Sequence, residues 1–285
     1  MSVREDVLDL RLNCPVIAVL GRKNSGKTAV IEYLVPKLRE NGFSIATVKH
    51  ISHGDFSIDR VGSDTWRHSR AGANPVVAFS RNEISVIIRS PSQSLEEIAR
   101  LILEIDADIL LLEGFSSTVL SDKSVGKIIC VKNLEEYGKF KETAEGEIIA
   151  FCSLKQLGES ILKIKSDLET LAGKTLGFIR KRKIILEILD SLAGLDCGKC
   201  GRKTCEDLAE EIYAGAASIN ECIPLSLKPK LNAKITVGGK TVPLQPFVSE
   251  IVRRTVLGMI SSLKNVDIKG DERVNIEIIK KKPKR

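Results

Sequence analysis

A chain of 285 residues with 43% hydrophobic and 28% charged residues has the composition of a folded globular protein with more than one domain. No run approaches about 18 apolar residues and the run at 16–20 is too short for a signal peptide, so we expect a cytoplasmic protein without a membrane span. The net charge is +7, but five of these charges lie in the last six residues, and the aromatic residues on which nucleobases stack make up only 4%. We therefore expect no nucleic-acid partner.

The first predicted elements are a buried strand and a helix. Residues 14–20 form a continuous apolar run that ends at Gly21, which is typical of a strand buried on both faces of a parallel sheet. Residues 27–40 carry apolar side chains at helical spacing, and Gly42 is placed to end that helix. Pro36 lies inside it, so we expect a kink there.

Further apolar segments follow along the first half of the chain. They lie at residues 43–48, 75–79, 84–88, 108–112, 127–131 and 147–151. Amphipathic stretches such as 95–105 separate some of them. This alternation of strands and helices predicts an α/β fold with a doubly wound, mainly parallel sheet and helices on both faces.

The pattern changes after about residue 152. Residues 154–195 predict helical stretches broken by Gly173 and Gly177, with a domain boundary near 155–175. A Gly-Gly pair at 238–239 predicts a small α+β end of the chain, made of a hairpin over 234–244, a helix over 246–264 and a strand over 273–279. We expect three parts: a nucleotide-binding domain at 1–160, a helical linker with a cysteine module at 161–227, and a C-terminal unit with a basic tail at 228–285.

A phosphate-binding loop lies between the first strand and the first helix. The eight residues from position 21 read Gly-Arg-Lys-Asn-Ser-Gly-Lys-Thr and match G-x-x-x-x-G-K-[ST], which in this context indicates a P-loop NTPase domain. The glycines let backbone N–H groups surround the phosphates, Lys27 reaches the β- and γ-phosphates, and the Thr28 hydroxyl ligates Mg²⁺. The nucleotide-binding residues are then Gly21, Asn24, Ser25, Gly26, Lys27, Thr28 and Ala29.

A carboxylate is needed to complete such a metal site. Glu113 ends a fully apolar predicted strand, at the edge where ligands of such sheets bind, and we assign it to Mg²⁺ and, with Lys27, to catalysis. The alternative is a solvated strand end. A phosphate loop contacts phosphates only, and we find no Asn-Lys-x-Asp guanine motif. The residues alone leave ATP and GTP open.

The three histidines of the chain cluster between positions 50 and 68. Their spacing does not match a usual zinc site. Ser63 can cap a short helix on which Asp64 and His68, four residues apart, share a face. The alternative interpretation is a local Asp–His pair on a surface helix.

Several motifs of the first half together resemble one family. After the phosphate loop come Thr-Val-Lys-His at 47–50, His-x-x-Phe-x-Ile-Asp at 53–59, Gly-Ser-Asp-x-x-Arg-His-x-x-Ala-Gly-Ala at 62–73 and Leu-Glu-Gly-Phe at 112–115. In this order they resemble the molybdopterin-guanine dinucleotide biosynthesis adapter family, MobB. The resemblance implies a GTP-binding protein with weak, Mg²⁺-dependent GTPase activity. Such a protein assists the guanylyltransferase MobA in attaching GMP to molybdopterin, and the family suggests a homodimer.

The resemblance also implies roles for residues at matching positions. Lys27, Thr28 and Glu113 would serve the nucleotide and Mg²⁺. Asp59, Asp64 and His68 would belong to a segment that faces the nucleotide or the partner, with Asp64 as a catalytic candidate.

The sequence departs from the family in two places. Arg22 and Lys23 stand in the phosphate loop where uncharged residues are usual, and Ser116 follows Glu-Gly-Phe where a lysine is usual. These departures concern the phosphate contacts and the choice of partner more than the nucleotide site itself.

A cysteine-rich segment occupies residues 196–224. Its spacing is C-x2-C-x4-C-x16-C, with the cysteines at Cys197, Cys200, Cys205 and Cys222. Four thiolates can hold a [4Fe–4S] cluster, and Gly198 and Gly201 permit the tight turns that a cluster needs. Zinc is the alternative, although structural zinc sites usually show two close cysteine pairs. A helix over 205–215 would return the chain towards the last cysteine.

This segment resembles the four-cysteine iron–sulfur domain of corrinoid iron–sulfur proteins and of electron-transport subunits. The match covers about 30 residues and does not reveal what the cluster does. The other cysteines, Cys14, Cys130 and Cys152, lie in or beside apolar strands, and we interpret them as small buried hydrophobic residues.

Two functions from different classes follow from these features. The first is a GTP-binding adapter in molybdenum or tungsten cofactor biosynthesis with an iron–sulfur module. The alternative is a nucleotide-gated iron–sulfur electron carrier, in which the nucleotide domain drives docking to a redox partner. A small-molecule kinase is a third reading, but the sequence suggests no phosphoryl acceptor.

Overall fold

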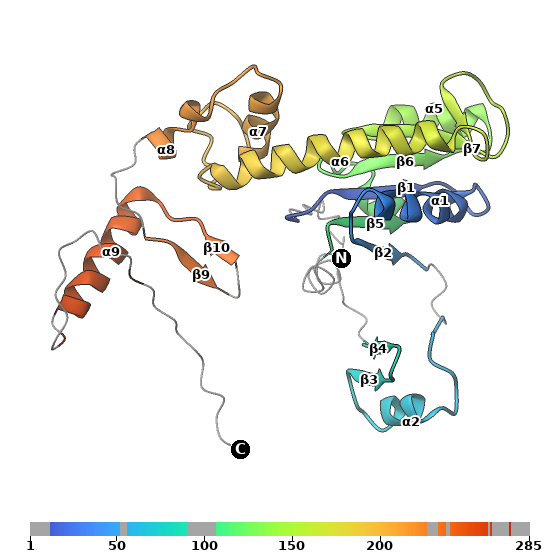
Figure 1. Cartoon of the computed structure of the whole chain (residues 1–285), viewed down its shortest axis with the longest axis horizontal. Coiled ribbons are helices and arrows are strands. Elements are labelled where there is room, and N and C mark those ends of the chain that lie inside the picture. The colour runs from blue at the N-terminus through green and yellow to red at the C-terminus, as the bar shows by residue number, and fades with distance from the viewer. Residues whose placement is uncertain are drawn as a thin grey trace, which may run out of the picture. The chain divides into compact units, whose positions relative to one another are not determined.

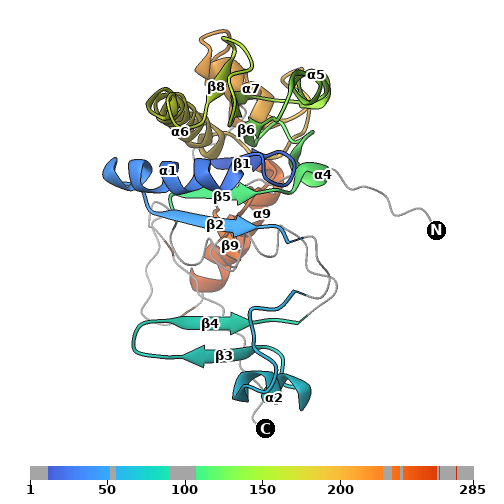
Figure 2. The same cartoon turned by 90° about the vertical axis from the view of Figure 1, so that its right-hand side faces the viewer.

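The computed structural model describes residues 12–51, 56–89, 107–226, 233–237 and 240–261, together with residues 263 and 274 (Figures 1 and 2). The chain divides into two compact units, Met1–Lys183 and Ile184–Arg285, and each is described by itself. None of the helices in the described ranges combines the length and the apolar character needed to cross a membrane.

The first unit is built around a six-stranded sheet in which neighbouring strands run parallel. In spatial order the strands are β2 (Ile45–Lys49), β5 (Ile109–Glu113), β1 (Val16–Leu20), β6 (Gly126–Cys130), β7 (Ile148–Ser153) and β8 (Ile161–Lys163). All but β8 coincide within one or two residues with predicted strands. Figure 1 shows β1, β5 and β2 side by side. The predicted α/β fold with a parallel sheet is confirmed.

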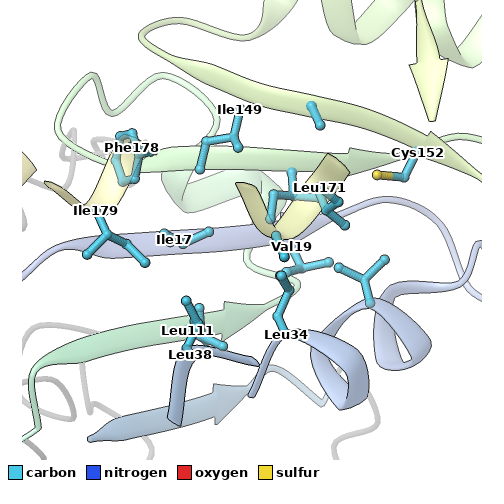
Figure 3. Close-up of a cluster of buried hydrophobic side chains, with 14 of the residues drawn as sticks. Ile17, Val19, Leu34, Leu38, Leu111, Ile149, Cys152, Leu171, Phe178 and Ile179 are labelled. Atoms are coloured by element: carbon cyan, nitrogen blue, oxygen red, sulfur yellow. The ribbon is translucent and has the colours of Figure 1, made fainter. Parts of the chain in front are cut away.

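One face of this sheet packs against α1 (Lys27–Glu40) and α6 (Leu168–Ser191). Ile17 of β1 lies in the same apolar cluster as Leu34 of α1 and Ile179 of α6, as Figure 3 shows. Because burying one such side chain contributes roughly 1.5–3 kcal/mol, these contacts hold both helices on the sheet.

The opposite face packs against α4 (Ser116–Val119) and α5 (Leu134–Thr143). Ala18 of β1 belongs to this second cluster, which also includes Val119 of α4 and Tyr137 of α5. All five residues of β1 are buried, because adjacent side chains of a strand point to opposite faces and both faces are covered. The predicted doubly wound arrangement is therefore confirmed.

The segments 75–79 and 84–88 form strands outside the main sheet. β3 (Val76–Phe79) and β4 (Ile84–Ile87) pair antiparallel in a two-stranded sheet of their own, and α2 (Asp64–Arg70) precedes them. The expectation that they join the mainly parallel sheet is wrong. Only four residues separate them, which suits a hairpin, whereas a parallel pair needs a crossover of a dozen residues or more.

The region 154–195 differs from the predicted broken helices. It contains β8, and α6 then runs unbroken through Gly173 and Gly177. A glycine inside a helix costs only about 1 kcal/mol relative to alanine, and the burial of neighbours such as Leu171 and Phe178 outweighs that cost. The division between the two units falls inside α6, further along the chain than 155–175.

The second unit contains the cysteine-rich segment and a small apolar core. The elements of this segment are α7 (Cys205–Tyr213), η1 (Ile219–Glu221) and α8 (Ile223–Ser226). Leu208 and Ala209 of α7 pack with Ile185 and Leu192. Thr204 caps the helix by accepting a hydrogen bond from the backbone N–H of Asp207.

The C-terminal elements agree with the sequence in kind. β9 (Ile235–Val237) and β10 (Lys240–Val242) pair antiparallel as a hairpin, and α9 (Pro246–Ser261) follows. The predicted Gly-Gly turn at 238–239, the basic tail and the stretch 95–105 lie outside the described residues, as does the predicted strand over 273–279 except for residue 274.

Candidate functional site

The phosphate loop lies between β1 and α1. Gly21 has φ 135°, and a Cβ at this position would stand 2.2 Å from the carbonyl oxygen of Cys130 in β6. Gly26, which caps α1, has φ 100°, and a Cβ there would stand 2.5 Å from the Ile164 side chain. Both positions require glycine, because the backbone is left-handed and the neighbours are too close for a side chain.

Two polar side chains of the loop are placed where a bound anion could contact them. The Lys27 ammonium donates hydrogen bonds to the carbonyl oxygens of Gly21, at 2.9 Å, and Arg22, at 2.8 Å, so it folds back over its own loop. The Ser25 hydroxyl is buried and has no hydrogen-bond partner within the described ranges. A buried hydroxyl without a partner is costly, and an anion held by the loop would satisfy it. Asn24, Thr28 and Ala29 are exposed at the same end of β1.

Glu113 meets the phosphate loop at the carboxyl end of the sheet. Its Oε1 atom accepts a hydrogen bond from the Thr28 hydroxyl at 3.2 Å. The same oxygen lies 3.0 Å from the Lys49 ammonium, and the Glu113 side chain is only 12% exposed. A threonine hydroxyl and a carboxylate are oxygen donors of the kind that Mg²⁺ takes, so these two residues fit a magnesium ion.

Strand register explains why these groups converge. β5 lies between β2 and β1, and Glu113 pairs with Lys49 on one side and with Val19 on the other. The backbone N–H of His50 donates to the Glu113 carbonyl oxygen at 2.9 Å. Parallel neighbours place their carboxyl ends at one edge, where Thr28 lies in the first turn of α1.

A second contact joins the loop to α5. Arg22 Nε lies 3.4 Å from Oε1 of Glu136, and Oε2 of this largely buried carboxylate accepts from the backbone N–H of Lys132 at 2.9 Å. Sequence reasoning missed both Glu136 and Lys49. Lys49 stands in the Thr-Val-Lys-His motif and could have been noticed there, whereas a glutamate in the first turn of a helix has no distinguishing local signal.

The structure does not join Asp64 to the phosphate loop. Ser63 caps α2 as predicted, accepting a hydrogen bond from the backbone N–H of Trp66. Asp64 is 88% exposed and pairs with Arg67 at 3.6 Å rather than with His68, so the alternative of a local Asp–His pair is not what forms. In the described ranges no hydrogen bond or ion pair links Asp64 to the residues of the loop.

Asp59 is the buried carboxylate of this segment. It accepts hydrogen bonds from Thr65 at 2.7 Å, Ser63 at 2.9 Å and Arg89 at 3.0 Å. These bonds, chiefly the one from Thr65, lower the pKa of Asp59. Asp59 therefore anchors α2 to the residues that follow β4. His53, the remaining histidine of this segment, lies outside the described residues.

The four clustered cysteines all lie in the second unit as free thiols. Cys205 and Cys222 are buried in its apolar core, Cys200 packs against that core, and Cys197 is exposed. Gly198 and Gly201 have φ 67° and 85°, and the backbone N–H of Gly201 donates to the Gly198 carbonyl, so the predicted tight turns are present. As they stand, no three His, Cys, Asp or Glu side chains of the described ranges are close enough together to hold a metal ion.

Arg202 ties the cysteine segment together. Its guanidinium donates twice to Glu211 of α7, at 3.0 and 2.6 Å, and once to Glu221 at 2.7 Å. A fourth bond, at 2.9 Å, goes to the Cys200 carbonyl oxygen. The bonds to Glu211 and then Glu221 raise the pKa of Arg202. These four bonds of Arg202, here called the Arg202 clamp, connect Cys200 with Glu211 and Glu221. A set of four thiolates suits an iron–sulfur cluster or zinc.

The remaining cysteines are buried, as predicted. Burial raises the pKa of the Cys14 thiol to about 11 and that of Cys152 to about 12, and it raises the pKa of Cys130 as well. These thiols stay protonated near neutral pH and behave as small apolar side chains.

The first unit is an α/β domain of the P-loop class. It has a buried first strand, a loop that admits only glycine at two positions, and a carboxylate at the end of the neighbouring strand. Residues 16–153 match the family described as "Molybdopterin guanine dinucleotide synthesis protein B", MobB. The first unit is therefore a MobB family domain. Residues 192–224 match a second family, described as "Putative Fe-S cluster".

Relatives in other organisms carry related names. The chain is 28% identical over 267 residues to the "Putative molybdopterin-guanine dinucleotide biosynthesis adapter protein" of Methanocaldococcus jannaschii, covering 94% of this chain and 99% of the relative. It is 23% identical to the corresponding Escherichia coli protein, over 59% of this chain and 95% of the relative. A crystal structure of a molybdopterin-guanine biosynthesis protein B aligns at 28% identity, over 58% of this chain and 99% of that chain, with a TM-score of 0.44.

Proposed function

We propose that the chain binds GTP at its phosphate loop and acts as a cytoplasmic adapter in molybdenum or tungsten cofactor biosynthesis. In this proposal it assists a MobA-like guanylyltransferase that attaches GMP to molybdopterin. Membership of the MobB family and the names of the relatives support the pathway. The observation that carries the nucleotide site is the contact of Thr28 with Glu113. It lies beside a loop that holds Lys27 and the Ser25 hydroxyl, for which the described part of the chain offers no hydrogen-bond partner.

The residues of the loop divide the work between them. Backbone N–H groups and the Ser25 hydroxyl hold the phosphates, while Lys27 leaves the carbonyl oxygens of its own loop and turns to the β- and γ-phosphates. Thr28 and Glu113 hold Mg²⁺. When bound, this ion neutralises charge on the phosphate oxygens. We expect slow hydrolysis, and we keep Asp64, exposed on α2, as a candidate contact to the nucleotide or the guanylyltransferase.

Titration calorimetry with GTP tests the nucleotide site. Lys27→Ala removes an ammonium that makes charge-assisted bonds, so we expect GTP affinity to fall about ten- to a hundredfold. Lys139→Met, which removes an exposed charge on α5, serves as the matched control and should bind as the wild type does. Equal affinity of the Lys27 variant and the wild type would sink the assignment. ATP as a competitor decides the base preference, and weak competition is expected.

We further propose that Cys197, Cys200, Cys205 and Cys222 hold a [4Fe–4S] cluster, with zinc as the alternative. The match of residues 192–224, the free thiols and the turns at the two glycines support this. Anaerobic purification followed by iron, sulfide and zinc analysis distinguishes the two groups, since only the cluster contains sulfide. Iron and sulfide near four each per chain are expected, and one zinc without sulfide would refute the cluster.

A nucleotide-gated electron carrier is the second candidate, because the exposed Cys197 would leave one corner of a cluster at the surface. Reduction potentials with and without GTP separate the candidates. A shift of the potential on adding GTP would support coupling, and an unchanged potential would leave the adapter role as the only candidate.

We assign the nucleotide role to residues 1–160, the cluster to 161–227 and partner docking to 228–285.

We also propose that the chain forms a homodimer through β3 and β4. Val77 pairs with Val86 and Phe79 with Ile84 across this two-stranded sheet, and all four side chains are exposed. An exposed apolar face of this kind is typical of an interaction surface, and the family resemblance favours a second copy as its occupant.

A further inference from the structure

Lys49 has no role in the nucleotide site as described so far, yet it shares an oxygen with that site. Its ammonium lies 3.0 Å from Oε1 of Glu113, and this same oxygen accepts the Thr28 hydroxyl at 3.2 Å. Lys49 is the last residue of β2, and its backbone is in register with Glu113. The sheet therefore places the two residues side by side, whatever conformation the long lysine side chain adopts.

The two partners differ in how easily they leave each other. The Glu113 side chain is only 12% exposed, so its negative charge is costly to bury without a cation beside it. The Lys49 side chain is 55% exposed, so its ammonium can rotate away and be solvated. Lys27, the other nearby cation, is bonded to carbonyl oxygens of its loop. Of the ion pairs in the described ranges, the one that neutralises Glu113 is with Lys49.

A Mg²⁺ ion and an ammonium that contact the same carboxylate oxygen repel each other, so each weakens the binding of the other. Both are cations, and Mg²⁺ demands a tight octahedral arrangement of oxygens at about 2.1 Å. We propose that Lys49 is the internal counter-ion of Glu113, and that the Mg²⁺ arriving with the nucleotide displaces it. This inference rests on the proposed function, in which Glu113 and Thr28 hold the metal.

The exchange has two measurable consequences. Without metal, Lys49 shields the incoming phosphates from the Glu113 carboxylate, so it supports GTP binding. With metal, Lys49 competes for the carboxylate, so it raises the Mg²⁺ concentration that the site needs. Lys49→Met should therefore weaken GTP binding in the absence of metal and strengthen Mg²⁺ binding, a combination that a merely structural role would not produce.

Calorimetry of GTP binding in EDTA and across a Mg²⁺ series measures both quantities. A partly exposed pair of this kind is worth up to about 1 kcal/mol, or about fivefold. For Lys49→Met we expect GTP affinity in EDTA to fall about fivefold and the half-saturating Mg²⁺ concentration to fall about fivefold. Lys49→Arg, which keeps the charge, and Lys139→Met, which removes an unrelated charge, should stay near the wild type.

A double-mutant cycle with Glu113→Gln shows whether the two residues act together. In that background the carboxylate is gone, so Lys49→Met should no longer change GTP affinity in EDTA. An unchanged Mg²⁺ requirement in Lys49→Met, or an equal loss of GTP affinity with and without metal, would overturn the counter-ion role. Should Lys49→Met fail to fold in a thermal melt, Lys49→Gln replaces it. A wild type that binds no GTP in either condition would instead refute the proposed function.

Discussion

Lys127 is a fully buried lysine of β6, and its ammonium donates to the carbonyl oxygens of Asp122 at 2.6 Å and Val125 at 2.9 Å. Burial lowers the pKa of Lys127 from 10.5 to about 8, against the opposing effect of Asp122. Below pH 8 the folded state must hold a buried charge that the unfolded chain exposes to water. We predict that Lys127→Met changes the pH dependence of stability.

The sign follows from proton binding. Between pH 8 and 10.5 the folded state has released the Lys127 proton while the unfolded chain still binds it, so this residue makes stability rise with pH. This lowering of the pKa from 10.5 to about 8 corresponds to about 3 kcal/mol, most of which appears between pH 7 and pH 10. The buried thiols act oppositely above pH 9, because their raised pKa values make the unfolded chain lose protons first.

Urea unfolding followed by circular dichroism at pH 7, 8, 9 and 10, with a thiol reductant, measures the effect. The stability of the wild type minus that of Lys127→Met should rise by about 2 to 3 kcal/mol across this range. The thiols are present in both proteins, so their effect cancels, and the two carbonyl groups left without a donor cost the variant the same at every pH. Lys139→Met, an exposed lysine, should give a flat difference. A flat difference for Lys127→Met as well would refute the reasoning.

Three further predictions concern the site, the cysteine segment and the dimer. Gly21→Ala places a Cβ 2.2 Å from the Cys130 carbonyl oxygen, so we expect loss of GTP binding by calorimetry, and normal affinity would show that the loop can move. Arg202→Met leaves Glu211 and Glu221 without their cation, so iron per chain and the melting temperature of the cluster-free protein should both fall; unchanged iron content would mean that the clamp does not position the cysteines. Phe79→Ser removes an exposed apolar side chain from β3, and light scattering should then report a monomer, whereas an unchanged dimer would place the interface elsewhere.

The sequence by itself determined the features that depend on local pattern. An apolar run followed by G-x-x-x-x-G-K-[ST] defines β1, the loop and α1, because a fully buried strand and a phosphate-binding turn leave few choices of residue. The spacing of the cysteines and the cap at Ser63 are local in the same sense. Glu113 could be chosen as well, since a carboxylate that ends an apolar strand stands out in one dimension.

Tertiary structure alone decided which distant groups meet. The contact of Lys49 with Glu113 depends on the strand order β2-β5-β1, and strand order is set by how helices pack on both faces rather than by any strand's own residues. The pairing of Arg22 with Glu136 and the unbroken α6 have the same origin. Local sequence patterns reflect the backbone conformations that neighbouring residues favour. Burial and long-range charge pairing depend instead on how segments far apart in the sequence pack together.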